Sequence, residues 1–218
     1  SEGEDVVVPP HPVSSPDSFG MATKSLIRGK LLILSRVGEQ TNAYARLRNQ
    51  ALVQPARLCL RHMRVGIGYD AHPLAAGRLL VVGGVEIPSE RGLAGHSDAD
   101  VLIHAIIEAL LGAASLGNIG ERFPETPEYR GASSLELLRR VARLLADNGW
   151  KLANIDATVV AEGPRLSGFV DGMRQRIGAA LGVEVARVGI KPKSSNGLGF
   201  TGKGEGMEAY AVALIEKT

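Results

Sequence analysis

Two polar residues spaced two positions apart, Asp70 and His72, end an alternating apolar stretch that begins at Met63. In extended backbone, residues i and i+2 point to the same side, so this carboxylate and this imidazole can reach one ion. His104 lies in an apolar stretch with helical spacing, where an imidazole needs a hydrogen-bond partner or a metal. Glu108, four residues further on, is one candidate partner. Alternatively, two histidines and one aspartate make the three-ligand set of a catalytic zinc, with a fourth position open to substrate.

Two further segments have the composition of phosphate-binding sites. Residues 95–100 (GHSDAD) place His96 and Ser97 at the expected start of a helix, where free N–H groups and the helix dipole favour anions. An ordinary helix cap, with Ser97 as the capping residue, explains the same pattern. Residues 191–206 are rich in glycine and contain three lysines and several hydroxyl groups. Such a loop can bind phosphate through backbone N–H groups, although glycine-rich turns are common and weakly specific by themselves.

The elements expected around these residues alternate between strands and helices. The predicted strands are residues 64–70, 79–82, 85–87, 155–161, 188–191 and 207–215. The predicted helices are residues 98–112, 133–148 with a capping box at its start, and 166–181. The fold class is therefore α/β: a single-domain sandwich of a mixed β-sheet of about four strands, with helices packed on one face and a small N-terminal hairpin turned by Gly83 and Gly84.

The composition limits the classes of protein to which the chain can belong. Its 218 residues are 44% hydrophobic and 22% charged, as in a globular protein of one domain. The one cysteine, Cys59, allows no internal disulfide, so a metal would be held by histidines and carboxylates. No stretch approaches the roughly 20 apolar residues of a membrane span. The basic residues 21–62 include one aromatic residue, Tyr44, and no recognisable binding module, which argues against nucleic acid as a partner.

The chain changes character at Met63. Residues 1–20 are rich in proline, and residues 21–62 are rich in arginine and poor in acidic residues. We expect residues 1–62 to be a disordered leader, a cloning remnant or a transit-like extension, and residues 63–218 to be the folded domain. With a transit peptide in residues 21–62 the protein would belong to a plastid-type organelle, and otherwise to the cytoplasm, as in bacteria.

Five motifs, taken together, resemble one enzyme family. They are residues 68–72 (GYDAH), 95–104 (GHSDADVLIH), 111–114 (LGAA), 118–124 (NIGERFP) and 198–205 (LGFTGKGE). Their order and spacing are similar to those of the 2-C-methyl-D-erythritol 2,4-cyclodiphosphate synthases, and the resemblance covers residues 63–218. It implies a metal-dependent phosphorus–oxygen lyase of the non-mevalonate isoprenoid pathway. This enzyme would convert 4-diphosphocytidyl-2-C-methyl-D-erythritol 2-phosphate to the 2,4-cyclodiphosphate and CMP.

The resemblance also implies roles for individual residues in a homotrimer whose active sites lie between subunits. Asp70, His72 and His104 would hold zinc, His96 and Ser194 would stabilise the transition state, and Ser97 would contact substrate. The methylerythritol side would be lined by Asn118, Ile119, Gly120, Phe123, Pro124, Glu125, Thr126 and Pro127. The cytidine pocket of the neighbouring subunit would be formed by Ala161, Pro164, Arg165, Leu166, Ser167, Lys193, Ser195 and Asn196. Phe200 and Lys203 would lie near the trimer axis, where relatives can hold an isoprenoid diphosphate.

Several positions depart from the family pattern. Asn118 and Glu125 each stand where relatives have aspartate, Lys193 where many have threonine, and Lys203 where arginine is usual. Asn196 replaces the glutamate that serves a second divalent cation, Mg²⁺ or Mn²⁺, and a neutral amide is the weaker ligand. Two other classes of function remain open. One is a zinc-dependent phosphodiesterase or phosphatase that releases a linear product, and the other is a catalytically weakened binding homologue.

Overall fold

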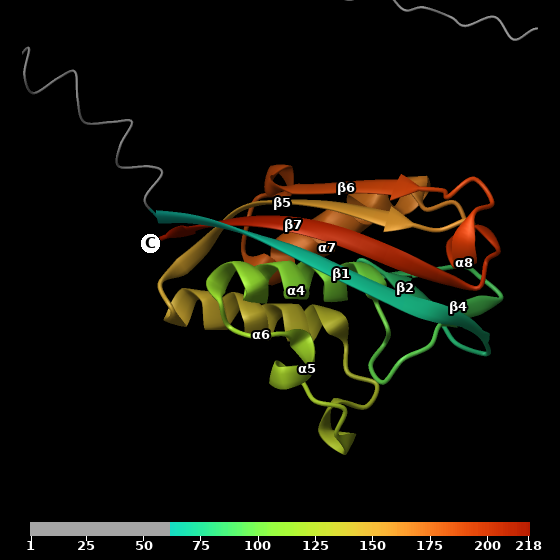
Figure 1. The fold of residues 1–218 in the computed structure, drawn as a ribbon, viewed down its shortest axis with the longest axis horizontal. Coiled ribbons are helices and arrows are strands. Elements are labelled where there is room, and N and C mark those ends of the chain that lie inside the picture. The colour runs from blue at the N-terminus through green and yellow to red at the C-terminus, as the bar shows by residue number, and fades with distance from the viewer. Residues whose placement is uncertain (1–61) are drawn as a thin grey trace, which may run out of the picture. The chain divides into compact units, whose positions relative to one another are not determined.

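Two long antiparallel strands, β1 (Met63–Ala76) and β7 (Gly206–Lys217), run through the middle of the sheet (Figure 1). The structure, a computed structural model, describes residues 62–218, so the predictions for the leader fall on residues outside the described part. The sheet has five strands in the order β4-β1-β7-β5-β6. The other three strands are β4 (Arg91–Leu93), β5 (Trp150–Val160) and β6 (Val188–Lys193). Because β6 runs parallel to β5 and the other pairs are antiparallel, the predicted mixed sheet is confirmed, with five strands instead of about four.

The predicted hairpin forms a separate two-stranded sheet from β2 (Leu80–Val82) and β3 (Val85–Ile87). Its turn consists of Gly83 and Gly84, with φ angles of 61° and 74°. Two successive positive φ angles are a conformation that glycine adopts without a steric penalty. The glycine pair therefore determines where the chain reverses.

Three helices of more than ten residues pack on one face of the five-stranded sheet: α4 (Val101–Ala114), α6 (Ser134–Asp147) and α7 (Val170–Leu181) (Figure 1). The shorter helical elements are α5 (Ile119–Arg122), α8 (Gly199–Gly202) and the 3₁₀ turns η2 (Pro127–Tyr129), η3 (Ser167–Phe169) and η4 (Val185–Arg187). Helix α4 begins and ends later than the predicted 98–112, and α7 begins after η3 instead of at residue 166. Among the described residues, no helix is long and apolar enough to cross a membrane.

Helix α4 packs directly on β1 because β1 carries glycines at the contact. A Cβ atom on Gly66 would lie 2.1 Å from the carbonyl oxygen of Ala109, and one on Gly68 would lie 1.9 Å from that of Ala105. Both distances are far below van der Waals contact, so any side chain would push the helix away. Residues 66, 68, 70 and 72 share one face of the strand. Asp70 and His72 therefore lie on the same face of β1 as the two glycines. This face packs on α4, and His104 lies in the first turn of that helix.

The described part of the chain leaves the other face of the sheet exposed. Alternate residues of β1 and β7 expose large apolar side chains there, with exposed fractions of 67% for Val65, 74% for Ile67, 48% for Tyr69, 43% for Tyr210 and 43% for Val212. By contrast, Ala109, Ala209 and Ala211 on the helix-covered side are at most 1% exposed. A contiguous apolar surface of this kind is typical of a contact with another protein surface.

Candidate functional site

Asp70, His72 and His104 converge at the end of the β1–α4 contact. The distance from Asp70 Oδ2 is 2.9 Å to His72 Nε2 and 3.0 Å to His104 Nδ1. The two ring nitrogens are 3.1 Å apart. The three side chains thus offer two nitrogens and one oxygen to a single point, and one such atom from each residue lies within 4.8 Å of the others. This confirms that the predicted ligands can reach one ion, and nitrogen and oxygen ligands of this kind suit zinc.

The ring of His72 is oriented by the backbone. Its Nδ1 lies 3.0 Å from the carbonyl oxygen of Ala94. A carbonyl oxygen only accepts hydrogen bonds, so Nδ1 carries the proton and donates it. The lone pair of the neutral ring is then on Nε2, the atom that faces Asp70 and His104. Metal-binding histidines characteristically donate their second ring N–H in this way.

The charges of the three side chains perturb one another. Burial, the largest single influence, acts to raise the pKa of Asp70, but hydrogen bonds and charge from His104 and His72 outweigh it and lower this pKa to about 2. Burial likewise acts to lower the pKa of His72, but the hydrogen bond and negative charge of Asp70 outweigh it, so this pKa is raised from 6.5. Asp70 is therefore a negatively charged carboxylate at neutral pH, and the two histidines beside it stabilise that charge.

The helix cap before His104 differs from the prediction. Asp100, not Ser97, is the N-cap of α4, because its carboxylate accepts the N–H of Ile103 at 3.1 Å. The same carboxylate accepts the N–H groups of Gly83 at 2.9 Å and Gly84 at 2.6 Å, which joins the hairpin to the helix. Burial raises the pKa of Asp100 to about 6, against the effect of these N–H groups. Ser97 instead places its Oγ 3.2 Å from His104 Nε2.

Two other contacts also differ from the sequence prediction. Glu108 is not the partner of His104, because its Oε1 accepts the N–H of Ile119 at 2.9 Å. The capping box predicted at the start of α6 does not form, since the side chain of Ser133 makes no capping hydrogen bond. Ser134, the next residue, is fully buried, and its Oγ lies 2.9 Å from His104 Nε2. Ser134 was not predicted as a site residue, because the Ser-Ser-Leu-Glu pattern is fully explained as the start of a helix.

A cavity of about 210 Å³ opens beside the three ligands. The predicted residues that line it are Asp70, His72, His96, Ser97, His104, Ile119, Gly120, Phe123 and Glu125. Tyr129 and Leu137 also line it and were not predicted. The ring of Tyr129 packs edge-on against Phe123 at 5.6 Å, and an aromatic residue in an otherwise polar stretch was the one sequence signal for it. Asn118, Pro124, Thr126 and Pro127 are absent from the lining, and Asn118 caps α5 instead.

The segments expected to bind cytidine lie together at the ends of β5 and β6. The N–H of Ala161 donates to the carbonyl oxygen of Lys193 at 2.9 Å, and Val160 pairs with Lys193 in the parallel ladder. None of the predicted cytidine-pocket residues belongs to the lining of the cavity beside His104. Pro164 and Lys203 line a different cavity of about 450 Å³, together with Glu162 and Arg91. The protomer therefore holds the predicted site in two separate parts.

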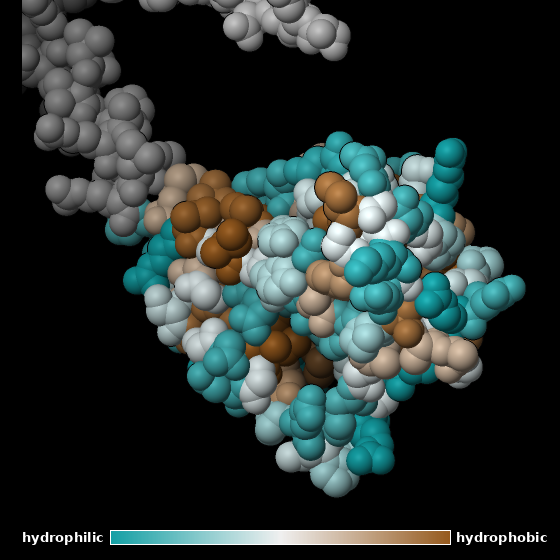
Figure 2. Space-filling view, turned by 45° about the vertical axis from the view of Figure 1, so that its right-hand side comes forward, coloured by the Kyte–Doolittle hydropathy of each residue, from teal (hydrophilic) through white to brown (hydrophobic). Residues whose placement is uncertain are grey.

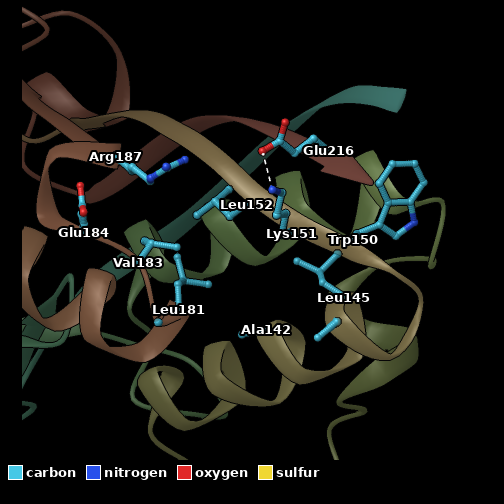
Figure 3. A pocket seen from close by; sticks show the side chains of 12 residues that line it. Ala142, Leu145, Trp150, Lys151, Leu152, Leu181, Val183, Glu184, Arg187 and Glu216 are labelled. Carbon is cyan, nitrogen blue, oxygen red and sulfur yellow. Dashed lines mark ion pairs between the residues drawn. The ribbon is translucent and has the colours of Figure 1, made fainter. Parts of the chain in front are cut away.

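A third cavity, of about 410 Å³, lies between α6, the end of α7 and the start of β5 (Figure 3). Its walls combine apolar side chains such as Leu145 and Leu181 with Lys151 and Glu216, whose charged groups are 3.2 Å apart. It shares no lining residue with the cavity beside His104. Size alone therefore does not identify the functional site in this protein.

Comparisons with known proteins show the family to which the chain is related. The YgbB family model matches residues 63–216. The chain is 60% identical over 154 residues to the 2-C-methyl-D-erythritol 2,4-cyclodiphosphate synthase of Symbiobacterium thermophilum, covering 70% of this chain and 98% of that protein. It is 56% identical to the synthase of the same name from Moorella thermoacetica, over 70% of this chain and 94% of that protein.

Solved structures show the same relationship. The structure of a 2C-methyl-D-erythritol-2,4-cyclodiphosphate synthase in a CDP-bound form has a TM-score of 0.65 and 34% identity, over 70% of this chain and all of that one. The CDP complex of IspF from Plasmodium falciparum has a TM-score of 0.65 and 28% identity, over 72% of this chain and 97% of that one. The bifunctional IspDF of Campylobacter jejuni has a TM-score of 0.69 and 36% identity, and the match spans 42% of its length and 72% of this chain.

Proposed function

The chain belongs to the YgbB family of 2-C-methyl-D-erythritol 2,4-cyclodiphosphate synthases, and we propose that its reaction takes place in the cavity beside Asp70, His72 and His104. The reaction is the cyclisation of the CDP-methylerythritol phosphate to the cyclodiphosphate in isoprenoid biosynthesis. The observation that carries the location is the convergence of three ligand atoms within 3.1 Å of one another at the edge of a cavity. The reaction also needs a metal ion, groups that contact the phosphates and a pocket for the nucleotide.

The three side chains fit zinc. Asp70 is a carboxylate, and His72 has a free lone pair on Nε2 because its Nδ1–H is bound to Ala94. Two nitrogen ligands and one oxygen ligand leave one coordination position open, as in catalytic zinc sites. When bound, zinc would supply positive charge that polarises phosphate oxygens. The side chains themselves fix where on the substrate that charge is applied.

The cyclisation forms one phosphorus–oxygen bond and breaks another. An oxygen of the 2-phosphate attacks the β-phosphorus of the cytidine diphosphate, and the bond from that phosphorus to the CMP oxygen breaks. The attacking oxygen is already anionic at neutral pH, so the site needs charge neutralisation and alignment more than a strong base. His96 and Ser97, which line the cavity next to His104, would contact the phosphates, and Ser194 would act from the nucleotide side.

A homotrimer would bring the two parts of the site together. The cytidine-pocket residues do not reach the cavity beside His104 in the protomer, so a second subunit would supply them. The uncovered face of the sheet, with Val65, Ile67 and Val212 exposed, offers an apolar surface for that assembly. Hydrophobic groups also reach the surface among hydrophilic ones on the side shown in Figure 2. We expect a mass of three chains in analytical ultracentrifugation, and a monomer would contradict this arrangement.

A second divalent cation, Mg²⁺ or Mn²⁺, would assist at the diphosphate. Asn196 is a poor ligand for it, and its Oδ1 accepts a hydrogen bond from Ser194 at 3.2 Å. The carboxylate of Glu162 lies close to the loop that carries Asn196, because its Oε2 is 3.5 Å from the N–H of Gly197. Glu162 would therefore bind the second cation in place of Asn196. Glu162→Gln should raise the Mg²⁺ concentration needed for half-maximal activity. The same requirement in the variant as in the wild type would exclude Glu162.

Product analysis tests the function directly. A chain beginning at Met63 should release CMP in the presence of Zn²⁺ and Mg²⁺, and phosphorus NMR of the mixture should show the two coupled resonances of a cyclic diphosphate. Free monophosphate in place of these resonances would indicate a phosphodiesterase or phosphatase. A folded, zinc-loaded protein that releases no CMP would indicate a binding homologue.

A further inference from the structure

The two ring nitrogens of His104 have different surroundings. Nδ1 faces the other two ligands, 3.0 Å from Asp70 Oδ2 and 3.1 Å from His72 Nε2. Nε2 faces two hydroxyl groups, Ser134 Oγ at 2.9 Å and Ser97 Oγ at 3.2 Å. A hydroxyl group can donate or accept, so these contacts alone do not fix which nitrogen carries the proton.

Asp98 settles the direction of the hydrogen bond from Ser134. Its carboxylate accepts the backbone N–H of Ser134 at 2.9 Å and that of Asp100 at 3.3 Å, and it makes a short contact with Ser134 Oγ. A carboxylate only accepts, so the hydroxyl proton of Ser134 points to Asp98. The lone pairs of Ser134 Oγ are then left for His104, and Nε2 must be the donor.

His104 and His72 are thus oriented in the same way, each donating one ring N–H and keeping the other nitrogen free for the metal, but the acceptor groups differ. At His72 a backbone carbonyl oxygen, that of Ala94, accepts the Nδ1–H and leaves Nε2 free. At His104 the acceptor is a side-chain hydroxyl, which acts as a fixed acceptor only because Asp98 takes its proton. The hydroxyl group of Ser134 is fully buried, so water does not compete strongly for these bonds.

We propose that Ser134 and Asp98 are positioning residues that act through His104: they keep its proton on Nε2 and thereby present the lone pair of Nδ1 to the metal. The inference rests on the proposed zinc site and deepens it. Across many proteins, residues that hydrogen-bond to a metal ligand contribute roughly 10- to 100-fold to metal affinity. Ser134 and Asp98 come from different segments, so sequence spacing gave no sign of the pair.

The test compares two adjacent serines. Ser134→Ala should weaken zinc binding, measured by competition with a chelator of known affinity, by roughly 10- to 100-fold. Ser133→Ala is the matched control, because Ser133 is exposed and its side chain makes no capping hydrogen bond. It should bind zinc with the affinity of the wild type. Ser134→Thr keeps the hydroxyl group and should recover most of the lost affinity.

A spectroscopic measurement separates this role from a merely structural one. In the zinc-loaded wild type, proton NMR should show a slowly exchanging N–H on Nε2 of His104, and Ser134→Ala should lose it. If Ser134→Ala does not fold, Asp98→Asn gives the same test. The amide has nearly the size of the carboxylate, but its NH₂ group can donate to Ser134 Oγ and turn the hydroxyl proton toward Nε2. Zinc affinity should again fall by roughly the factor expected for Ser134→Ala.

The outcomes distinguish this proposal from the zinc site on which it rests. A wild-type protein that binds no zinc would overturn the metal centre and the role of Ser134 with it. Wild-type zinc binding, combined with equal affinities in Ser134→Ala and Ser133→Ala, would overturn the role of Ser134 alone. If Ser134→Ala does not fold, an unchanged zinc affinity in Asp98→Asn would overturn the role of Ser134 in the same way.

Discussion

The two parts of the site differ in how the protomer holds them. Asp70, His72 and His104 are half-buried or buried, and each contacts the other two within 3.1 Å. Lys193, Ser194 and Asn196 are exposed, and no described contact ties them to the ligands. The first part is preorganised within one chain, whereas the second would be completed by assembly. The metal and nucleotide functions should therefore respond separately to mutation.

The largest effect is expected at the preorganised part. His104→Ala removes one of three ligands and should abolish stoichiometric zinc binding. CMP release should fall by about 1,000-fold or more, because metal polarisation of phosphate contributes several kcal/mol to the transition state. Zinc analysis and the CMP-release assay measure the two effects, and circular dichroism checks the fold. Full activity in a zinc-free variant would show that the reaction does not need the metal held by the ligand part.

Mixing two inactive chains tests whether the parts belong to different subunits. His104→Ala damages the ligand part, and the double substitution Lys193→Ala with Ser194→Ala damages the nucleotide part. If the proposed homotrimer forms, oligomers reassembled from equal amounts should regain about a quarter of wild-type activity, since about one site in four then combines two intact parts. Reassembled trimers with no more activity than the mean of the parents would place the whole site within one chain.

A substitution under the ligands should reduce stability without touching them. Gly68→Ala would place a Cβ atom 1.9 Å from the carbonyl oxygen of Ala105, so β1 and α4 must separate. We expect a loss of about 3 kcal/mol in the free energy of unfolding, at the upper end of overpacking effects. Urea denaturation measures it. Gly77→Ala is a control on the same chain, because no atom lies within 4 Å of its added Cβ, although its φ of 73° carries some strain of its own. Equal stability losses in the two variants would contradict the close β1–α4 contact.

The pH dependence of zinc binding should be smaller and should follow His72. Protons compete with zinc for Nε2, and the pKa of His72 in the metal-free protein is raised above 6.5. Below that raised pKa, protonation of His72 alone should lower the apparent zinc affinity by about tenfold per pH unit, and above it this contribution should level off. Asp70 contributes little in this range, since its pKa is lowered to about 2. Chelator competition from about pH 5 to about pH 9 measures the curve, and an inflection below 6.5 would contradict the assignment.

Local patterns in the sequence predicted the elements that carry the three candidate ligands because each pattern depends on residues close together in the chain. The alternation up to Asp70 placed two ligands on one face of β1, and the apolar spacing around His104 predicted α4. The choice of Asp100 over Ser97 as the cap could not be predicted in this way. It depends on the N–H groups of Gly83 and Gly84, which belong to a hairpin elsewhere in the sequence.

The same reason explains why Ser134 was missed and why the cytidine side stays a prediction. Ser134 reaches His104 only because α6 packs against α4, a contact that no pattern within residues 133–136 specifies. The residues proposed for cytidine lie together in the fold, and none of them lines the cavity beside His104 in the described part of the chain. Spacing within one sequence carries no direct information about a neighbouring subunit.

X-ray absorption at the zinc edge of the purified protein tests the metal centre most directly. Zinc held by Asp70, His72 and His104 should show a first shell with two imidazole nitrogens, oxygen ligands and no sulfur. A sulfur neighbour, which Cys59 would have to supply, or a shell with fewer than two imidazoles would contradict it.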